Sequence, residues 1–110
     1  MTKEEIRLYR SISIEICQLE QRIVRLEMMG HNDDITQPLR DLYRKKLNTL
    51  IDGQLRIEQA IESLDPTERE LMRLRYIDGE EWLDISATIH YEWSQTHRIH
   101  ARALDKIKNL

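Results

Sequence analysis

The sequence has little of what turn-rich or disulfide-stabilised proteins are built from. Its 110 residues include three Gly, two Pro, one Cys and no Phe. So few Gly and Pro argue against frequent tight turns, and therefore against an all-β sandwich. The lone Cys17 excludes a disulfide framework within one chain and a zinc site built from cysteines. Because charged residues make up 34% of the chain, long helices are favoured, and we expect an all-α protein.

Long hydrophobic runs and a charge surplus are also missing. The N-terminal stretch MTKEEIRLYR is too polar for a secretion signal or a membrane span, so we expect a cytoplasmic protein with no membrane partner. Seventeen Lys and Arg against twenty Asp and Glu give a net charge of −3. This balance argues against binding polyanions through bulk charge. Any contact with DNA must therefore depend on particular residues.

The N-terminal half has the pattern of two long amphipathic helices. One covers residues 4–29, and its apolar residues are spaced three and four apart: Tyr9, Ile12, Ile16, Leu19, Ile23 and Leu26. This spacing is typical of a coiled-coil seam. The other covers residues 38–63 with a matching seam: Tyr43, Leu47, Leu50, Gln54, Ile57, Ile61 and Leu64. The polar residues 30–37 predict a turn, with Gly30 ending the first helix.

Apolar residues outside the second seam predict a further partner. Leu42, Ile51 and Leu55 would stay exposed on an isolated two-helix hairpin. We therefore predict that residues 1–63 form an oligomerisation region, a helical hairpin or coiled coil that pairs with a second copy as a homodimeric four-helix bundle. The flanking charges do not select a parallel pairing, so its direction stays open.

A second domain is predicted over residues 64–110. Asp65 can cap a helix, Pro66 suits the first helical position, and Glu68 can complete a capping box. That helix is predicted to run to Ile77 and to stop at Asp78 and Gly79. From residue 80 onward the pattern is a short helix, a tight turn and a longer helix, which together indicate a helix-turn-helix.

The predicted helix-turn-helix has suitable residues at its critical places. Such a motif needs a small residue in the first helix, a residue that tolerates positive φ in the turn, and an apolar contact in the second helix. Ser86, His90 and Thr96 occupy these places, and His is among the few non-Gly types enriched at positive φ. The predicted buried face comprises Trp82, Ile85, Ile89, Thr96, Ile99, Ala103 and Ile107.

Two segments of this domain resemble region 4 of bacterial primary sigma factors. LDPTERELMRLRY at residues 64–76 resembles its opening, and IHARALDKI at residues 99–107 resembles its close. With Tyr9-Arg10-Ser11 near the start and AIESL at residues 60–64, the chain is similar to small phage and prophage regulators of the ArpU type. The resemblance implies a transcription regulator, often of late phage genes. Because the coiled-coil half offers a means of pairing, we expect it to bind double-stranded DNA as a dimer.

The resemblance also implies which residues meet DNA. It places a recognition helix over residues 92–108, with Arg98 suited to guanine and Arg102 to a phosphate. The full set of candidate DNA-binding residues is Trp93, Ser94, Gln95, His97, Arg98 and Arg102. Two plainer roles stay open: Trp93 as a core residue, and Arg102 as an ion-pair partner of Glu70.

The sequence departs from the sigma pattern where bases would be read. Region 4 usually has Gly at the place of His90, Ser at the place of Glu92, and arginine-rich residues at the places of Trp93, Ser94, Gln95 and His97. A different operator is therefore expected. Residues 81–110 carry four basic and four acidic residues, so tight binding should need either pairing of two chains or help from RNA polymerase.

Two other classes of function compete with a DNA-binding regulator. A protein-interaction module that binds RNA polymerase or a sigma factor without reading DNA is the alternative function. An enzyme is disfavoured, because the His97 and His100 pair lacks a third ligand at metal spacing and no nucleophile–base or phosphate-loop motif exists. We predict no catalytic residue, metal or cofactor. If His97 and His100 face DNA, binding should strengthen below about pH 6.5.

Overall fold

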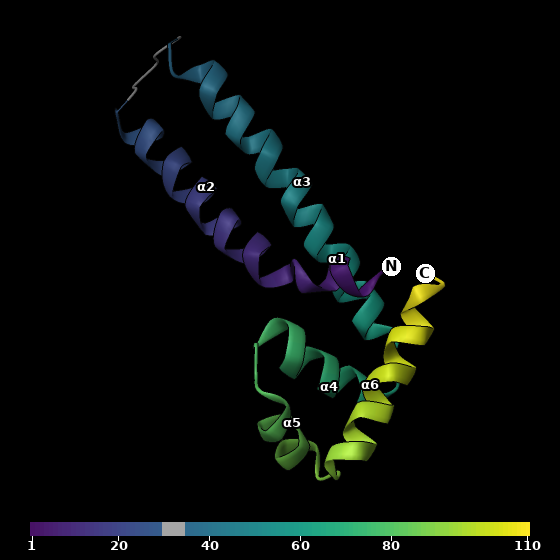
Figure 1. Cartoon of the computed structure of the whole chain (residues 1–110). Coiled ribbons are helices and arrows are strands. Elements are labelled where there is room, and N and C mark those ends of the chain that lie inside the picture. The colour runs from purple at the N-terminus through teal and green to yellow at the C-terminus, as the bar shows by residue number, and fades with distance from the viewer. Residues whose placement is uncertain (30–34) are drawn as a thin grey trace. The chain divides into compact units, whose positions relative to one another are not determined.

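The computed structural model describes residues 1–29 and 35–110, and these residues are almost entirely helical. In chain order the elements are α1 (Lys3–Arg7), α2 (Tyr9–Met29), α3 (Gln37–Glu62), α4 (Pro66–Met72), the π-helical η1 (Arg73–Ile77), α5 (Trp82–Ile89) and α6 (Trp93–Lys108) (Figure 1). No strand occurs in the described ranges, so the all-α class is confirmed. Gly30 and most of the predicted first turn lie outside the described residues.

The first predicted helix is interrupted by one residue. Leu8 separates α1 from α2, and its backbone N–H is shared between the carbonyls of Glu5 and Ile6. Thr2 caps the start of α1, with its Oγ1 accepting from the N–H of Glu5 at 3.2 Å. A continuous helix over residues 4–29 is therefore wrong at this point. None of the helices that the structure describes is long and apolar enough to span a bilayer.

The chain divides into two compact units that do not follow the predicted boundary at residue 64. The core unit comprises Met1–Arg10 and Arg56–Leu110, and the two-helix unit comprises Ser11–Leu55. The reason is that Ile6 of α1 and the C-terminal end of α3 are buried in one apolar cluster with α4, α5 and α6. Short helices α4 and α5 expose too much apolar surface to form a core alone, and these added segments cover it.

The core unit buries the face that the helix-turn-helix pattern predicts. Its apolar cluster draws on every helix of the unit: Ile6, Ile57, Ala60, Ile61, Leu64, Leu71, Met72, Tyr76, Ile85, Ile89, Ile99, Ala103 and Ile107. Thr96 is also fully buried, while Trp82 is half-buried. Each fully buried Ile or Leu stabilises the fold by about 1.5–3 kcal/mol relative to exposure, so this cluster supplies the main driving force.

The capping box at the start of α4 also fixes the far end of α6. Asp65 and Glu68 form the predicted box, with the N–H of Asp65 donating to Oε1 of Glu68 at 3.2 Å. Lys106 Nζ donates to Oδ2 of Asp65 at 2.9 Å and to Oε1 of Glu68 at 2.7 Å. These bonds raise the pKa of Lys106 and lower the pKa of Asp65. The Lys106 ammonium group is thus engaged in contacts that join α6 to the start of α4.

The segment after α4 widens into a π-helical turn. The N–H of Asp78 donates to the carbonyl of Arg73 at 2.9 Å, five residues earlier. Arg73 also donates to Oε2 of Glu58 at 2.8 Å, and the Tyr9 hydroxyl donates to Oε1 of the same carboxylate at 2.7 Å. Burial, together with the Glu58 bond, raises the pKa of Tyr9 to about 12. Glu58 therefore joins α2, α3 and η1 within the core unit.

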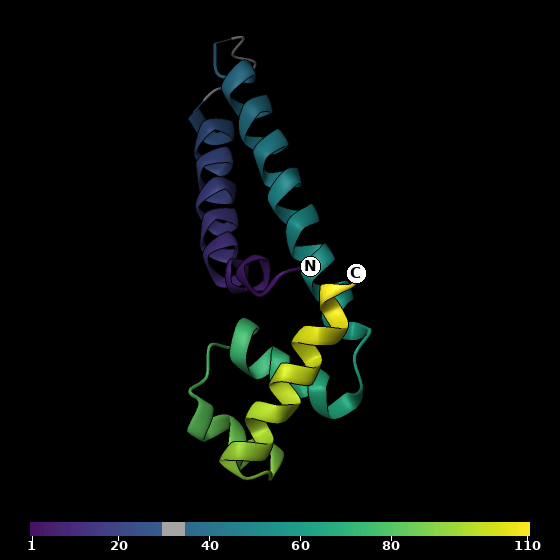
Figure 2. The same cartoon turned by 45° about the vertical axis from the view of Figure 1, so that its right-hand side comes forward.

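In the two-helix unit, α2 and α3 run side by side, as Figures 1 and 2 both show. The predicted seam of α2 is used here, since Ile16, Leu19 and Ile23 are buried. Gln54, the polar interruption of the α3 seam, donates a hydrogen bond to the Ser13 hydroxyl. Arg44 and Glu27 form an ion pair between the same two helices.

One histidine of the core unit is buried as a neutral ring. Nε2 of His100 lies 2.7 Å from the Tyr76 hydroxyl. The pKa of His100 is lowered to about 4, first by burial and then by the nearby positive charges of Lys3, His97, Arg75 and Arg7. The expectation that His100 would gain charge below about pH 6.5 and strengthen DNA binding is therefore wrong, because this ring faces the core.

Buried His100 should make stability depend on pH. Its pKa is near 6.5 in the unfolded chain and about 4 in the fold, so acidification protonates the unfolded state first. The free energy of unfolding should fall by about 2 kcal/mol from this residue between pH 7.5 and 5. Urea unfolding of the wild type and of His100→Gln at both pH values measures it. Equal losses in the two proteins would contradict the assignment.

Candidate nucleic-acid interface

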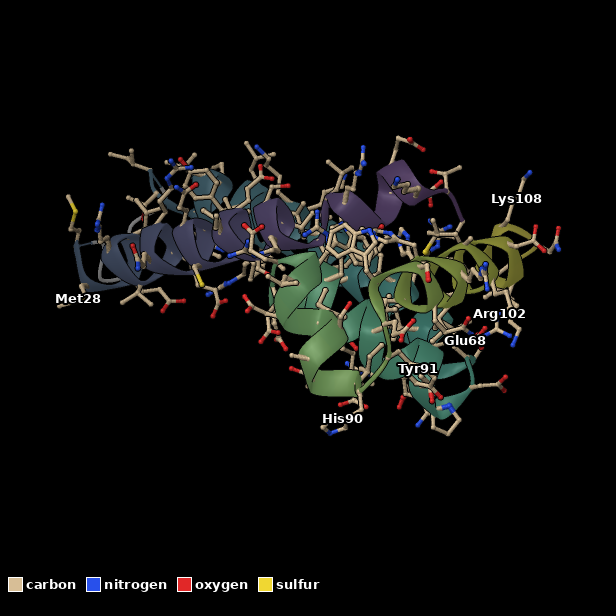
Figure 3. All side chains as sticks on the ribbon, turned by 60° about the horizontal axis from the view of Figure 1, so that its bottom comes forward. Met28, Glu68, His90, Tyr91, Arg102 and Lys108 are labelled. Atoms are coloured by element: carbon tan, nitrogen blue, oxygen red, sulfur yellow. The ribbon has the colours of Figure 1, made fainter. Side chains whose placement is uncertain are left out.

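The turn between α5 and α6 has the backbone shape that the sequence predicts. His90 ends α5 in the left-handed conformation with φ 63° and ψ 39°. The N–H of Tyr91 donates to the carbonyl of Ser86 at 3.2 Å, which closes the end of α5. Figure 3 labels His90 and Tyr91 at this turn, with α6 continuing from it toward Arg102 and Lys108. A histidine therefore fills the place where glycine is usual.

A pair of buried hydroxyls holds α5 against α6. The Ser86 hydroxyl donates to Oγ1 of Thr96 at 2.9 Å, and Oγ1 of Thr96 donates to the carbonyl of Glu92 at 2.9 Å. Both side chains are buried. Small side chains at this crossing let the two helix backbones approach closely, as the helix-turn-helix pattern requires. Ser86 and Thr96 are thus buried in contact between α5 and α6.

Opposite its buried face, α6 presents a row of exposed side chains. The row comprises Ser94, Arg98, Ala101, Arg102, Asp105 and Lys108. Arg98 and Arg102 are one helical turn apart and form no ion pair with another residue of the described ranges. The proposed pair between Arg102 and Glu70 is accordingly not formed. Two guanidinium groups are left available on one face of one helix.

Three other predicted site residues lie at the margins of this row. Trp93 is the first residue of α6 and is 53% exposed, so it is not a core residue. Gln95 is half-buried beside the helix crossing. His97 is half-buried between the rings of Trp82 and Trp93, each with its centroid 4.6 Å from the imidazole. The structure therefore groups Ser94, Arg98 and Arg102 and sets His97 apart.

Trp82 joins two parts of the core unit that sequence reasoning did not connect. Its ring contacts His97 and His100 of α6, with a centroid distance of 4.6 Å to each. On η1, the guanidinium carbon of Arg75 lies 4.7 Å from the Trp82 ring centroid. Arg75 belongs to the segment that resembles sigma region 4, and a local motif carries no signal for a contact across a turn. Arg75 is thus a charged residue near the site that the sequence analysis missed.

The charge of the exposed row differs from the charge of the whole segment. Residues 81–110 are neutral in sum, but Lys106 is bound to Asp65 and Glu68. The exposed row itself carries Arg98, Arg102 and Lys108 against one acid, Asp105. This row can offer bidentate guanidinium donors to base edges or to phosphate oxygens. The row therefore has a net positive charge, although the charges of residues 81–110 sum to zero.

The described residues offer no grouping for a metal ion. Among residues 1–29 and 35–110, no three side chains of the His, Cys, Asp and Glu types gather closely enough to hold one. His97 and His100 are instead divided between the Trp93 contact and the Tyr76 hydrogen bond. No protein-family model matches the sequence, and neither does any curated protein or solved structure.

Proposed function

We propose that this chain is a sequence-specific DNA-binding transcription regulator of the phage or prophage type that its sequence resembles. In this proposal α5, the His90 turn and α6 form the helix-turn-helix, and α6 enters the major groove. The observation that carries the proposal is the exposed pair of Arg98 and Arg102 on the helix that the Ser86–Thr96 contact holds in place. The proposal gives the chain no catalytic role and a cytoplasmic location.

The exposed row of α6 divides by the chemistry of its members. Arg98 can donate two hydrogen bonds to O6 and N7 of guanine, while Ser94 can bond a base edge or a phosphate. Arg102 is suited to phosphate contact, which supplies affinity without sequence preference. Trp93 offers an apolar contact to a thymine methyl or a sugar at the start of the helix. His97 is assigned to positioning the Trp93 ring, because the two rings are in contact.

We also propose that the chain acts as a homodimer. On α2, a second apolar row lies opposite the seam that faces α3: Ile14, Cys17, Val24 and Met28, with Gln21 between them. Ile14, Val24 and Met28 are 61%, 52% and 73% exposed. Spacings of three and four on an exposed side are the pattern that a partner helix covers. Two chains would bring two recognition helices to a two-fold DNA site and double the phosphate contacts.

A second candidate is a module that binds RNA polymerase or a sigma factor without reading DNA. One observation favours it: Leu83 on α5 is 71% exposed, beside the exposed acid Asp84. Selection of duplexes from random DNA at low salt separates the two candidates. Enrichment of a sequence supports the DNA reader, whereas retention of polymerase without any enriched duplex supports the module and rejects base reading.

Changes at Arg98 and Arg102 should have different effects. Arg98→Ala should weaken binding to the selected duplex by about 1–3 kcal/mol and relax base preference at one position. Arg102→Ala should weaken binding to all duplexes alike and lower the slope of log K against log salt by about 0.9. Fluorescence anisotropy across a salt series measures both, with Lys45→Ala in the two-helix unit as the control. Unchanged specificity in Arg98→Ala would remove Arg98 from the reading surface.

The dimer proposal is best tested on the exposed row of α2. Val24→Asp should shift the protein from dimer to monomer in sedimentation equilibrium while its helical circular dichroism stays intact, because Val24 is exposed within one chain. Gln18→Asp adds the same charge to an exposed position outside the row and is the matched control. Leu19→Asp is less informative, since Leu19 is buried against α3. A wild type that is monomeric at micromolar concentration would refute the proposal.

A further inference from the structure

A pocket of about 310 Å³ in the core unit is lined by an unusual concentration of positive charge. Lys3, Arg7 and Arg10 come from the N-terminal segment and Arg75 from η1, with Trp82 as an aromatic wall. None of the described residues that line it is acidic. The three N-terminal cations are spaced four and three residues apart. The pocket is therefore built by segments that are distant in sequence.

The four charges in this pocket have no ion-pair partner among the described residues, unlike five other cations of the chain. Ion pairs neutralise Arg44, Arg56, Arg69, Arg73 and Lys106 elsewhere in the described chain. None of the four pocket cations forms an ion pair with another described residue. Gathering like charges without a counter-charge costs free energy, and a bound anion would offset that cost.

One of the guanidinium groups is held in position by the fold, and a second lies beside Gly79. Arg75 donates from Nη1 to the carbonyl of Glu80 at 2.9 Å and lies over the Trp82 ring. Gly79 has φ +73°, and a Cβ there would come within 2.5 Å of Cζ of Arg10. The absence of a side chain at Gly79 thus gives the Arg10 guanidinium its place. Groups held in advance lose less entropy when they bind a ligand.

The pKa values of two side chains near the pocket respond to its positive charges. Besides burial, the charges of Lys3, Arg75 and Arg7 lower the pKa of His100. Burial raises the pKa of Tyr76, and there Arg7 and Arg75 act in the opposite direction while the carboxylate of Glu4 acts with burial. Glu4 is thus one acid near the pocket, set against four cations.

We propose that this pocket binds a phosphate group, and that in the DNA complex the phosphate belongs to the backbone beside α6. Guanidinium forks bind phosphate oxygens in pairs, which suits Arg7, Arg10 and Arg75. Trp82 lines the pocket and contacts His97, which in turn contacts Trp93 at the start of α6. The backbone assignment rests on the proposed function, whereas the phosphate site itself does not.

The phosphate site is tested without DNA. Inorganic pyrophosphate titrated into the full chain by calorimetry at low salt should bind once per chain. The double variant Arg7→Gln/Arg10→Gln should lose at least tenfold in affinity, while Lys45→Gln/Lys46→Gln in the two-helix unit should not. Gly79→Ala should also weaken binding, because it displaces Arg10. If Gly79→Ala unfolds, the pyrophosphate affinity of Arg7→Gln alone replaces it as the test. No pyrophosphate binding to the wild type, or equal loss in the control, overturns the site.

The source of the phosphate is tested with the selected duplex. Arg7→Gln/Arg10→Gln should lower the slope of log K against log salt by about 0.9 and leave base preference unchanged. An unchanged slope overturns the backbone assignment, and a free phosphorylated compound is then the occupant. Loss of base preference in Arg98→Ala tests the proposed function separately. If no duplex is enriched but pyrophosphate binds, the proposed function fails and the phosphate site stands.

Discussion

The hydrogen bond between Ser86 and Thr96 is the contact on which the arrangement of the core unit depends. A hydroxyl in an apolar core costs free energy unless it is bonded, so the Ser86 hydroxyl must keep Thr96 as its acceptor. Their bond at 2.9 Å fixes how far α6 can rotate about its own axis against α5. That rotation decides which side chains of α6 are buried and which are exposed. The availability of Arg98 and Arg102 is therefore a consequence of a contact on the opposite face.

The N-terminal segment is part of the core unit rather than an appendage to a coiled coil. Ile6 is fully buried among residues of the C-terminal half, so α1 is held by the same apolar cluster as α6. Lys3 and Arg7 of α1 line the same pocket as Arg75. A helix of five residues has little stability alone. Here tertiary packing supplies the stability, and the segment in return supplies charge that the C-terminal half lacks.

Local patterns predicted the elements well, and contacts between distant segments were not predictable. Helical periodicity identified the buried residues of α5 and α6, and the Asp65–Glu68 pair marked the start of α4, because each depends on neighbours within a few residues. His100 was misplaced because its burial depends on Tyr76 and α1, which lie far away in sequence. For the same reason the gathering of Arg7, Arg10 and Arg75 could not be seen, although their separate positions were plain.

The π-helical turn at Arg73–Ile77 makes the length of this segment as important as its composition. Such a turn holds one residue more than an α-helical turn of similar rise. Removing a residue here would restore an ordinary α-helical turn and redirect the side chains within η1. Tyr76 would then leave His100, and Arg75 would leave the ring of Trp82. A deletion in η1 would therefore disrupt the core contact and the cationic pocket together.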